Sequence, residues 1–271
     1  DIAHKIKDKF DADNFEEISV ASPGFINFKL SKIWLEKEII RCIDLKNNFG
    51  NQNKNNKKVQ VEFVSVNPTG KLHLGHIRGA VIGSTISNIL ESQNFTVTRE
   101  YYINDAGNQI DFFCKSIIER IKELQGKDFK ITDEMYSGID ILNISKKIIN
   151  KYPDYQNYDF SNITEDEFED LKKISIKICI NEIMDDLKSL NISHDNWFSE
   201  SSLIDAGYLD ETIDILKELN LIYVKDEATW IKTEELGDDR DNVLFKSSDK
   251  KPTYFATDIA VSYTHLTLPT R

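Results

Sequence analysis

Two histidines, His73 and His76, stand three positions apart in the sequence HLGH, with Gly75 between them. Residues at i and i+3 lie on the same face of an α-helix, so both rings share one face if a helix begins here. Imidazole N–H groups at a helix N-terminus add to the free backbone donors there, and both favour negative charge on a phosphate. Glycine lets a flat base or a ribose approach the backbone closely. The pattern therefore indicates nucleotide binding.

A tight turn and a cation precede the histidines. The sequence Asn67-Pro68-Thr69-Gly70 has the composition of a sharp turn, which would aim the helix that follows. Lys71 comes two residues before His73, where a cation could neutralise phosphate charge. A solvated turn lysine is an equally good interpretation of Lys71.

The histidine pair alone is also compatible with roles that involve no nucleotide. It could be half of a zinc site, although no third ligand is near in sequence and His194 is isolated. The rings could be surface histidines with ordinary hydrogen bonds, and a tetrapeptide of this kind also occurs by chance.

The elements that must position the motif form a strand–helix–strand pattern. Residues 59–66 have the composition of a strand, residues 74–93 have apolar residues at helical spacing, and residues 96–103 form the next strand. Such a unit predicts a parallel sheet. Residues 110–220 look mostly helical and are predicted to be an insertion between strands. Within them one long helix has two apolar sides, which are Leu171, Ile174 and Ile178 on one and Ile180, Ile183 and Leu187 on the other.

The flanking segments are shorter. Residues 25–30 alternate as a strand after a Pro-Gly turn, Ser31 is placed to cap a helix, and the polar residues 46–58 indicate a linker. Near the other end, residues 221–225 and 228–232 suggest a hairpin and residues 242–246 a strand. Residues 253–256 are predicted to be a strand that runs into residues 257–260.

Composition limits the class of protein. The 271 residues allow one large domain or two smaller ones, and no apolar run is long enough to cross a membrane. The three cysteines lack the spacing of a metal site and are predicted to be buried small hydrophobic residues. The N-terminus lacks a signal sequence, so a cytoplasmic location is expected. The formal net charge of −12 argues mildly against nucleic-acid binding.

The last eleven residues, VSYTHLTLPTR, break the preceding pattern. They resemble a translated adapter or vector scar, so we expect residues 261–271 to be a non-native tail.

The string EFVSVNPTGKLHLGHIRGA, followed by TREYYINDAGNQI, resembles the signature of arginyl-tRNA synthetases, which are class I enzymes. Further blocks resemble that family in the right order, namely SPGFINF, ISHDNWFSESSL, GDDRDNVLFK and TYFATDIA. The resemblance implies an α/β fold. Residues 1–45 would be the remnant of a small α+β domain that contacts tRNA. Residues 59–260 would be an incomplete Rossmann-type catalytic domain, with a largely helical insertion at about 110–220.

The resemblance also implies roles for single residues. His73 and His76 match the HIGH motif of the family, which binds ATP and stabilises charge at the α-phosphate. Thr69 and Gly75 would join them in binding ATP, and Lys71 would assist catalysis. The positions that match arginine-binding groups of the family are Glu62, Asn67, Tyr254 and Asp258. Carboxylates suit a guanidinium group, which is planar and always charged. No protein-bound metal is implied.

The reaction implied is the joining of L-arginine to ATP, followed by transfer of arginine to tRNA(Arg). Mg²⁺ is expected to arrive with ATP, the protein is expected to be a monomer, and arginine activation in this family generally needs the tRNA. The family's second nucleotide-binding half, its KMSKS-like loop and its anticodon domain have no counterpart here, so we expect this chain not to aminoacylate tRNA by itself. A different H-x-G-H nucleotidylyltransferase, or a non-catalytic chain that binds ATP or RNA weakly, remains an alternative.

Overall fold

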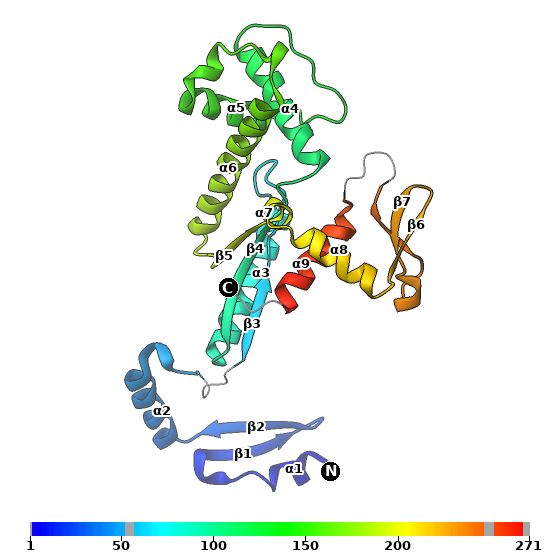
Figure 1. Cartoon of the computed structure of the whole chain (residues 1–271). Coiled ribbons are helices and arrows are strands. Elements are labelled where there is room, and N and C mark those ends of the chain that lie inside the picture. The colour runs from blue at the N-terminus through cyan, green and yellow to red at the C-terminus, as the bar shows by residue number, and fades with distance from the viewer. Residues whose placement is uncertain (1, 52–56, 247–251, 268–271) are drawn as a thin grey trace. The chain divides into compact units, whose positions relative to one another are not determined.

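The computed structural model describes residues 2–51, 57–246 and 252–267. The chain divides into two compact units, which are Asp1–Lys57 with Ile89–Thr96, and Lys58–Asn88 with Val97–Arg271. The first unit contains helix α1 (Ile2–Lys7), strands β1 (Phe15–Ala21) and β2 (Phe25–Leu30), and helix α2 (Lys32–Leu45). β1 and β2 pair as an antiparallel hairpin, drawn in blue in Figure 1. Ser31 caps α2 as predicted, because its Oγ accepts the Trp34 N–H at 3.2 Å.

The second unit is built on a three-stranded sheet in the order β3-β4-β5. β3 is Lys58–Glu62, β4 is Thr96–Ile103, and β5 is Asn196–Ser199, which runs parallel to β4. The predicted βαβ unit is therefore present, with helix α3 (Leu74–Ser92) between β3 and β4. β3 ends earlier than predicted, because Val64 and Ser65 take positive φ angles of 71° and 44° and leave the strand conformation.

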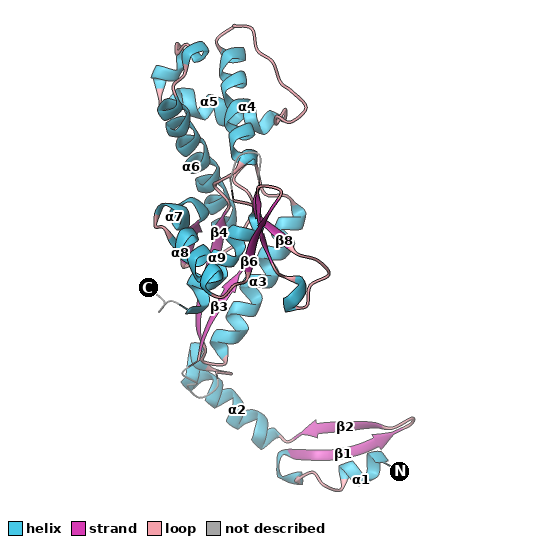
Figure 2. Ribbon diagram, turned by 45° about the vertical axis from the view of Figure 1, so that its right-hand side comes forward, coloured by secondary structure: helices cyan, strands magenta, loops and turns pink. Residues whose placement is uncertain are grey.

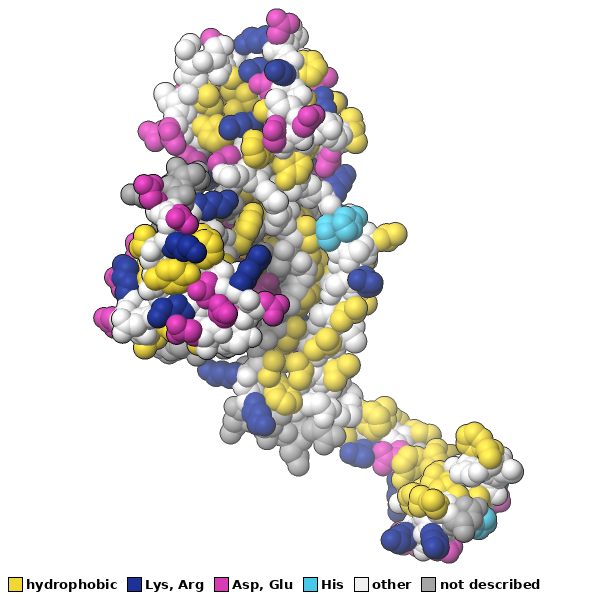
Figure 3. Space-filling model, turned by 90° about the vertical axis from the view of Figure 1, so that its right-hand side faces the viewer, with side chains coloured by type: hydrophobic (Ala, Val, Ile, Leu, Met, Phe, Trp, Pro, Cys, Tyr) yellow, Lys and Arg dark blue, Asp and Glu magenta, His cyan; other side chains and the backbone are white. Residues whose placement is uncertain are grey.

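α3 packs on the sheet through its smallest residues. Ala80, Gly83 and Ser87 are its buried positions, and Ser87 Oγ donates to the Gly83 carbonyl oxygen at 2.8 Å. A Cβ on Gly83 would lie 2.2 Å from Cγ of Phe63, so only glycine allows this close approach. Large apolar residues occupy the other side of the helix, where Val81, Ile82 and Ile86 are about half exposed. Figure 3 shows hydrophobic side chains gathered in a row that leads away from the histidines.

The insertion is helical through α4 (Asn108–Leu124), α5 (Ile139–Lys151) and α6 (Glu165–Ser189), which form the helical body labelled in Figures 1 and 2. A capping box between Thr164 and Glu167 starts α6. The two apolar sides predicted for this helix are confirmed. Leu171 and Ile178 belong to the core of the helical body, whereas Ile180, Ile183 and Leu187 pack with Phe63 and Tyr101 against the sheet. The prediction missed β5, because a four-residue strand is too short to show alternation.

The last part contains helices α7 (Glu200–Asp205) and α8 (Tyr208–Glu218), strands β6 (Ile222–Lys225), β7 (Ala228–Ile231) and β8 (Asn242–Phe245), and helix α9 (Tyr254–Thr267). The three strands form an antiparallel sheet in the order β6-β7-β8, and the hairpin predicted at its start is confirmed. Short 3-10 helices complete the described chain at Ala12–Asn14, Lys46–Asn48, Pro153–Gln156, Phe160–Asn162 and Glu234–Leu236.

The strand predicted at residues 253–256 is wrong. Only Pro252 bridges to Phe245, and α9 begins at Tyr254 because the Ala256 and Thr257 N–H groups already bond to the Thr253 carbonyl. Proline brings no N–H group for a longer ladder. α9 continues through residues 261–267, so the described part of the expected tail is helical; residues 268–271 lie outside the described residues.

The cysteines and the helices were also the subject of predictions from the sequence. Cys114 and Cys179 are buried, as predicted, but Cys42 is exposed on α2, which has no buried residue. No helix in the described parts of the chain combines the length and the apolar character needed to cross a membrane.

Candidate functional site

The two histidines lie at the start of α3 and bond within their own turn. The His73 N–H donates to His76 Nδ1 at 3.3 Å, and the Gly75 N–H donates to His73 Nδ1 at 3.1 Å. The rings stack with centroids 3.4 Å apart. Because both Nδ1 atoms accept, the neutral rings carry their hydrogen on Nε2 and can donate from there. Burial, and then the neighbouring His73, lower the pKa of His76, which keeps that ring neutral.

Contacts with β4 hold the loop that leads to these histidines. The Tyr101 hydroxyl donates to the Val66 carbonyl at 2.9 Å and accepts the Val66 N–H at 3.1 Å. Ser65 Oγ accepts the Tyr102 N–H at 3.0 Å. The loop leaves β3 with strained backbone and is therefore fixed to the middle strand by side-chain bonds.

The remaining residues predicted from this loop are placed differently from one another. Asn67 Nδ2 donates to Gln109 Oε1 at 2.6 Å, at the start of α4. Thr69 is half-buried, and its N–H bonds to the Asn67 carbonyl. Lys71 is exposed shortly before the start of α3, and its exposure is compatible with both interpretations of this residue.

A cavity of about 540 Å³ opens between the start of α4, the start of α6, α7 and the start of α9. Its lining includes Gln109, Glu200, Tyr254 and Thr257. Two of its other carboxylates, on Asp111 and Glu169, are paired with Lys172. Among the described residues, Glu165 and Glu200 of this lining make no ion pair. Lys246 is a second cation of the lining beside Lys172, so four carboxylates stand against two lysines and the net charge is negative.

Glu200 is the most buried of these carboxylates, at 3% exposed. With the Asn104 amide turned to face its acceptors, that nitrogen donates to Glu200 Oε2 at 2.9 Å, and the Tyr102 hydroxyl also bonds to the carboxylate. The Thr257 hydroxyl lies beside it and donates to the Tyr254 carbonyl at 3.0 Å. All three neighbouring groups are neutral. Burial is the main cause that raises the pKa of Glu200, with the charges of Asp105 and Asp258 adding to it. A buried carboxylate without a cation is costly, so this arrangement suits a cationic ligand.

Two of the residues predicted to bind arginine lie on the first turns of α9. Tyr254 and Asp258 are four positions apart and exposed, and Tyr254 lines the cavity. The residue is exposed as a whole, but partial desolvation of its carboxyl group raises the pKa of Asp258. Glu62 is exposed at the end of β3 and is not part of the cavity lining. The structure thus brings Tyr254 together with Glu200 and Gln109 and joins Asn67 to them through Gln109. Glu62 and Asp258 are both absent from the lining of this cavity.

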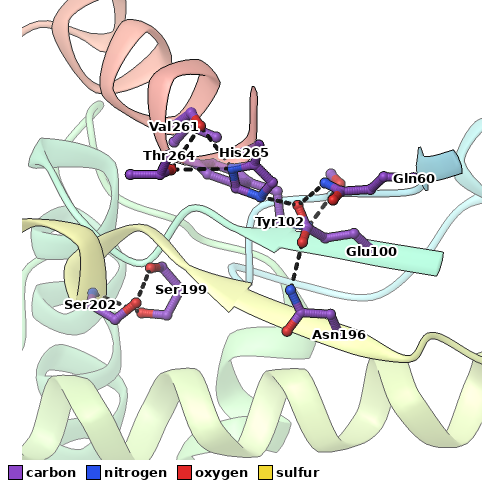
Figure 4. Close-up of polar contacts among 10 residues, drawn as sticks. Gln60, Glu100, Tyr102, Asn196, Ser199, Ser202, Val261, Thr264 and His265 are labelled. Carbon is purple, nitrogen blue, oxygen red and sulfur yellow. Dashed lines mark hydrogen bonds and ion pairs between the residues drawn. The ribbon is translucent and has the colours of Figure 1, made fainter. Parts of the chain in front are cut away.

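A row of polar side chains crosses the three strands, as Figure 4 shows. Gln60 Nε2 and Asn196 Nδ2 donate to the two oxygens of Glu100 at 2.8 and 2.5 Å, and His265 Nε2 lies 2.6 Å from Oε1. The hydrogen bond to Glu100 raises the pKa of His265. Glu100 is 2% exposed and fully partnered, so this row binds α9 to the sheet and offers no free group to a ligand.

Sequence reasoning did not single out Glu200, Thr257 or Tyr102. Glu200 lies inside the block ISHDNWFSESSL, which resembled the family, and it directly follows β5. A carboxylate at the end of a parallel strand is a signal that could have found it. No group of three or more His, Cys, Asp or Glu side chains is placed to hold a metal ion in residues 2–51, 57–246 and 252–267.

Two family models match the chain. The model of the class I tRNA synthetase (R) catalytic domain matches residues 38–267, and that of the arginyl-tRNA synthetase N-terminal domain matches residues 1–30. The catalytic-domain match thus includes the first part of the predicted tail.

Similar proteins have the same family name. The arginine–tRNA ligase of Staphylococcus carnosus is 39% identical over 267 residues, covering 97% of this chain and 47% of the relative. The arginine–tRNA ligase of Geobacillus thermodenitrificans is 41% identical over 263 residues, covering 96% of this chain and 46% of the relative. The crystal structure of a putative arginyl-tRNA synthetase from Campylobacter jejuni is 30% identical with a TM-score of 0.77, covering 87% of this chain and 51% of that one. The chain spans about half the length of the curated relatives it matches. With the catalytic-domain model matching most of its length, the chain belongs to the arginyl-tRNA synthetase family of class I tRNA synthetases.

Proposed function

We propose that this chain contains the arginine-binding and ATP-binding part of an arginine–tRNA ligase. The enzyme would activate L-arginine with ATP and transfer it to tRNA(Arg). The observation on which the proposal depends is the buried Glu200 carboxylate, held by neutral donors beside a cavity that is linked to the loop of the histidine motif.

Arginine would enter the cavity with its guanidinium group facing Glu200, and Asp258, which lies outside the lining but whose charge acts on Glu200, would add to the attraction. A guanidinium has five N–H donors in a fixed plane, so it can serve two carboxylates and compensate their charge at once. Tyr254, one turn before Asp258 on α9, would contact the side chain of the substrate. Asn67, in the loop that follows β3 and bonded to Gln109 of the lining, would then take the amino-acid end of arginine.

ATP would bind at the start of α3. The Nε2–H groups of His73 and His76 are donors suited to phosphate oxygens, and they would stabilise the charge that develops at the α-phosphate. Gly75 would let the nucleotide approach the backbone, with Thr69 and Lys71 beside it. Mg²⁺ would arrive bound to the ATP phosphates.

The reaction needs no covalent bond to the protein. The arginine carboxylate oxygen would attack the α-phosphorus in line, forming arginyl-adenylate while pyrophosphate leaves. The protein would contribute position and electrostatic stabilisation. The adenylate would then pass arginine to the terminal ribose of tRNA(Arg), with the N-terminal unit as part of the tRNA-contacting surface. We further propose a monomer that acts in the cytoplasm.

Calorimetric titration with L-arginine and with ATP tests the assignment of the two ligands. We expect Asp258→Asn to weaken arginine binding about tenfold and to leave ATP binding unchanged, since it removes one charged partner of the guanidinium. We expect His76→Ala to do the reverse. Asp210→Asn, on the exposed side of α8, is the matched control. Loss of both ligands in one variant with intact folding, or binding of neither to the unaltered chain, would refute the proposal.

A further inference from the structure

Residues 104–109, which are the turn between β4 and α4 together with the first two residues of α4, direct their polar side chains at other protein segments; we call them the turn of residues 104–109. Asp105 contacts the start of α7. Its Oδ1 accepts the Ser201 N–H at 2.8 Å, and its Oδ2 accepts the hydroxyls of Ser199 at 2.6 Å and Ser201 at 3.0 Å. One carboxylate therefore accepts three hydrogen bonds from a segment about a hundred residues further along the chain.

Those two serines flank Glu200. Ser199 is the N-cap of α7 and Ser201 is its second residue, so the chain is tied to Asp105 immediately before and after Glu200. Asn104, the neighbour of Asp105, donates to the Glu200 carboxylate itself. The main chain and the side chain of Glu200 are thus both fixed from the same turn.

The other end of the turn holds a second candidate ligand of arginine. Gln109 Oε1 accepts the Asn67 amide nitrogen at 2.6 Å, which leaves the Asn67 amide oxygen to accept a bond from a substrate. Both ends of the turn therefore contact the groups assigned to arginine. Asp105 is absent from the lining of the cavity, so its contribution acts through Glu200.

We propose that the turn of residues 104–109 sets the geometry of the arginine site, with Asp105 as the positioning residue that holds Glu200 through the first turn of α7. The proposal rests on the proposed function, because it assigns Glu200 to the guanidinium of arginine.

Asp105 places a second negative charge beside Glu200, which costs electrostatic free energy. Its charge therefore does not stabilise the ionised Glu200, and its contribution must come from its hydrogen bonds. The groups that face Glu200 come from two elements. They are Tyr102, Asn104 and Asp105 from β4 and its turn, and Thr257 and Asp258 from α9. Asp105 and Asp258 repel its charge. Asparagine in place of Asp105 would relieve that repulsion, but its single carbonyl oxygen cannot accept all three bonds from the serines. A loosened α7 would then let the Glu200 carboxylate shift, and small shifts of such a group weaken binding strongly.

A double-mutant cycle on L-arginine affinity separates positioning from general damage. We expect Asp105→Asn to weaken arginine binding about tenfold in the unaltered chain, and less than about twofold when Glu200→Gln is already present. Asp205→Asn, an exposed aspartate on the same helix, is the control and should change nothing. Equal losses from Asp105→Asn in both backgrounds would overturn the proposal. If Asp105→Asn does not fold, Ser201→Ala removes one of the three bonds, and its expected loss of about threefold must also vanish with Glu200→Gln.

A carboxyl ¹³C NMR titration of Glu200 in the ligand-free chain tests the positioning without arginine. Asp105→Asn removes a repelling charge and would lower the pKa of Glu200 in any case, so the test uses Ser201→Ala, which keeps the charge of Asp105. We expect Ser201→Ala to lower the pKa of Glu200, because the loosened carboxyl is better hydrated. An unchanged pKa of Glu200 would overturn the proposal even where arginine binds. If the unaltered chain fails to bind arginine while the pKa of Glu200 falls as expected, the proposed function fails and the hold of Asp105 on Glu200 stands.

Discussion

The two parts of the candidate site differ in the sequence distance of the contacts that form them. At the start of α3, His73, Gly75 and His76 bond to one another within three positions, and the motif is largely exposed. Around the cavity, Asp105 and Ser201 meet across 96 positions, and Glu200 is almost fully buried. The first part is a local structure that any helix N-terminus could form, whereas the second exists only when three distant segments have assembled.

This difference explains how each part can handle charge. Exposed imidazoles are hydrated and keep their hydrogen-bonding capacity at little cost. A buried carboxylate loses hydration and must be compensated, so it discriminates strongly between cationic and neutral ligands. The start of α3 suits general recognition of phosphate, and the cavity suits selection of one amino acid.

The largest effect is expected from Glu200→Gln, which tests whether charge in the buried part governs selection. Glutamine keeps the size but cannot offer two charged acceptors to a guanidinium, so L-arginine should bind about 100-fold more weakly, or about 2.7 kcal/mol. Calorimetry measures this. Glu165→Gln removes the other unpaired carboxylate described in the lining and should cost less than about twofold. Equal losses in the two variants would mean that only the total charge of the cavity matters.

Two glycines of α3 test how far the helix that begins at the histidine motif depends on packing against distant residues. Gly83→Ala would place a Cβ 2.2 Å from the Phe63 ring, so we expect it to lower the free energy of unfolding by about 2 kcal/mol. Gly79 has no atom within 4 Å of such a Cβ, and Gly79→Ala should raise that free energy by about 0.5–1 kcal/mol, because alanine favours helix. Urea unfolding compares them, and opposite signs are the required outcome.

Arginine affinity should depend on pH more strongly than ATP affinity. Desolvation raises the pKa of both Glu200 and Asp258, and only their ionised forms attract a guanidinium. As pH falls through these raised values, arginine binding should weaken, by up to about tenfold per pH unit for each proton taken up. The stability of the ligand-free protein depends on pH with the opposite sign. Between the ordinary and the raised pKa of these carboxyl groups, the folded chain binds more protons than the unfolded chain. Its free energy of unfolding therefore decreases as pH rises through that window.

Calorimetry across the acidic range would measure this dependence. Glu200→Gln and Asp258→Asn together should flatten it, because neither replacement titrates. An equally steep profile in that double variant would contradict the assignment of the two carboxylates.

The smallest effect is expected from Gly75→Ala, inside the local motif. The new Cβ would lie 3.0 Å from Cε1 of His73, so the ring must move by a few tenths of an ångström. ATP should bind about threefold more weakly. The affinity for arginine should stay unchanged, because the ATP site and the arginine site would be contacted by separate groups. A loss of arginine affinity in this variant would show that the two parts are coupled.

Much of the framework could be predicted from the sequence, because it depends on local periodicity. The strand at residues 96–103 matches β4, the helix at residues 74–93 is α3 to within one residue, and Ser31 caps α2. The two apolar sides of α6 were visible for the same reason. The early end of β3 was not, since the positive φ angles of Val64 and Ser65 are accompanied by loop contacts with Tyr101 and Tyr102 on another strand.

For the candidate site, the sequence by itself determined the histidine motif, its turn and the family resemblance, because their residues are adjacent and interact at helical spacing. Only the tertiary structure decided which carboxylate is buried beside the cavity and which residues hold it. From the sequence, Asn104, Asp105 and Gln109 are weak ligand candidates, because they follow the C-terminal end of a strand, and they could equally form an ordinary turn. Nothing local shows that they bond to Glu200, α7 and Asn67. Burial and long-range hydrogen bonds are created when the strands and helices assemble, so they are properties of the packed chain and leave no periodic trace in the sequence.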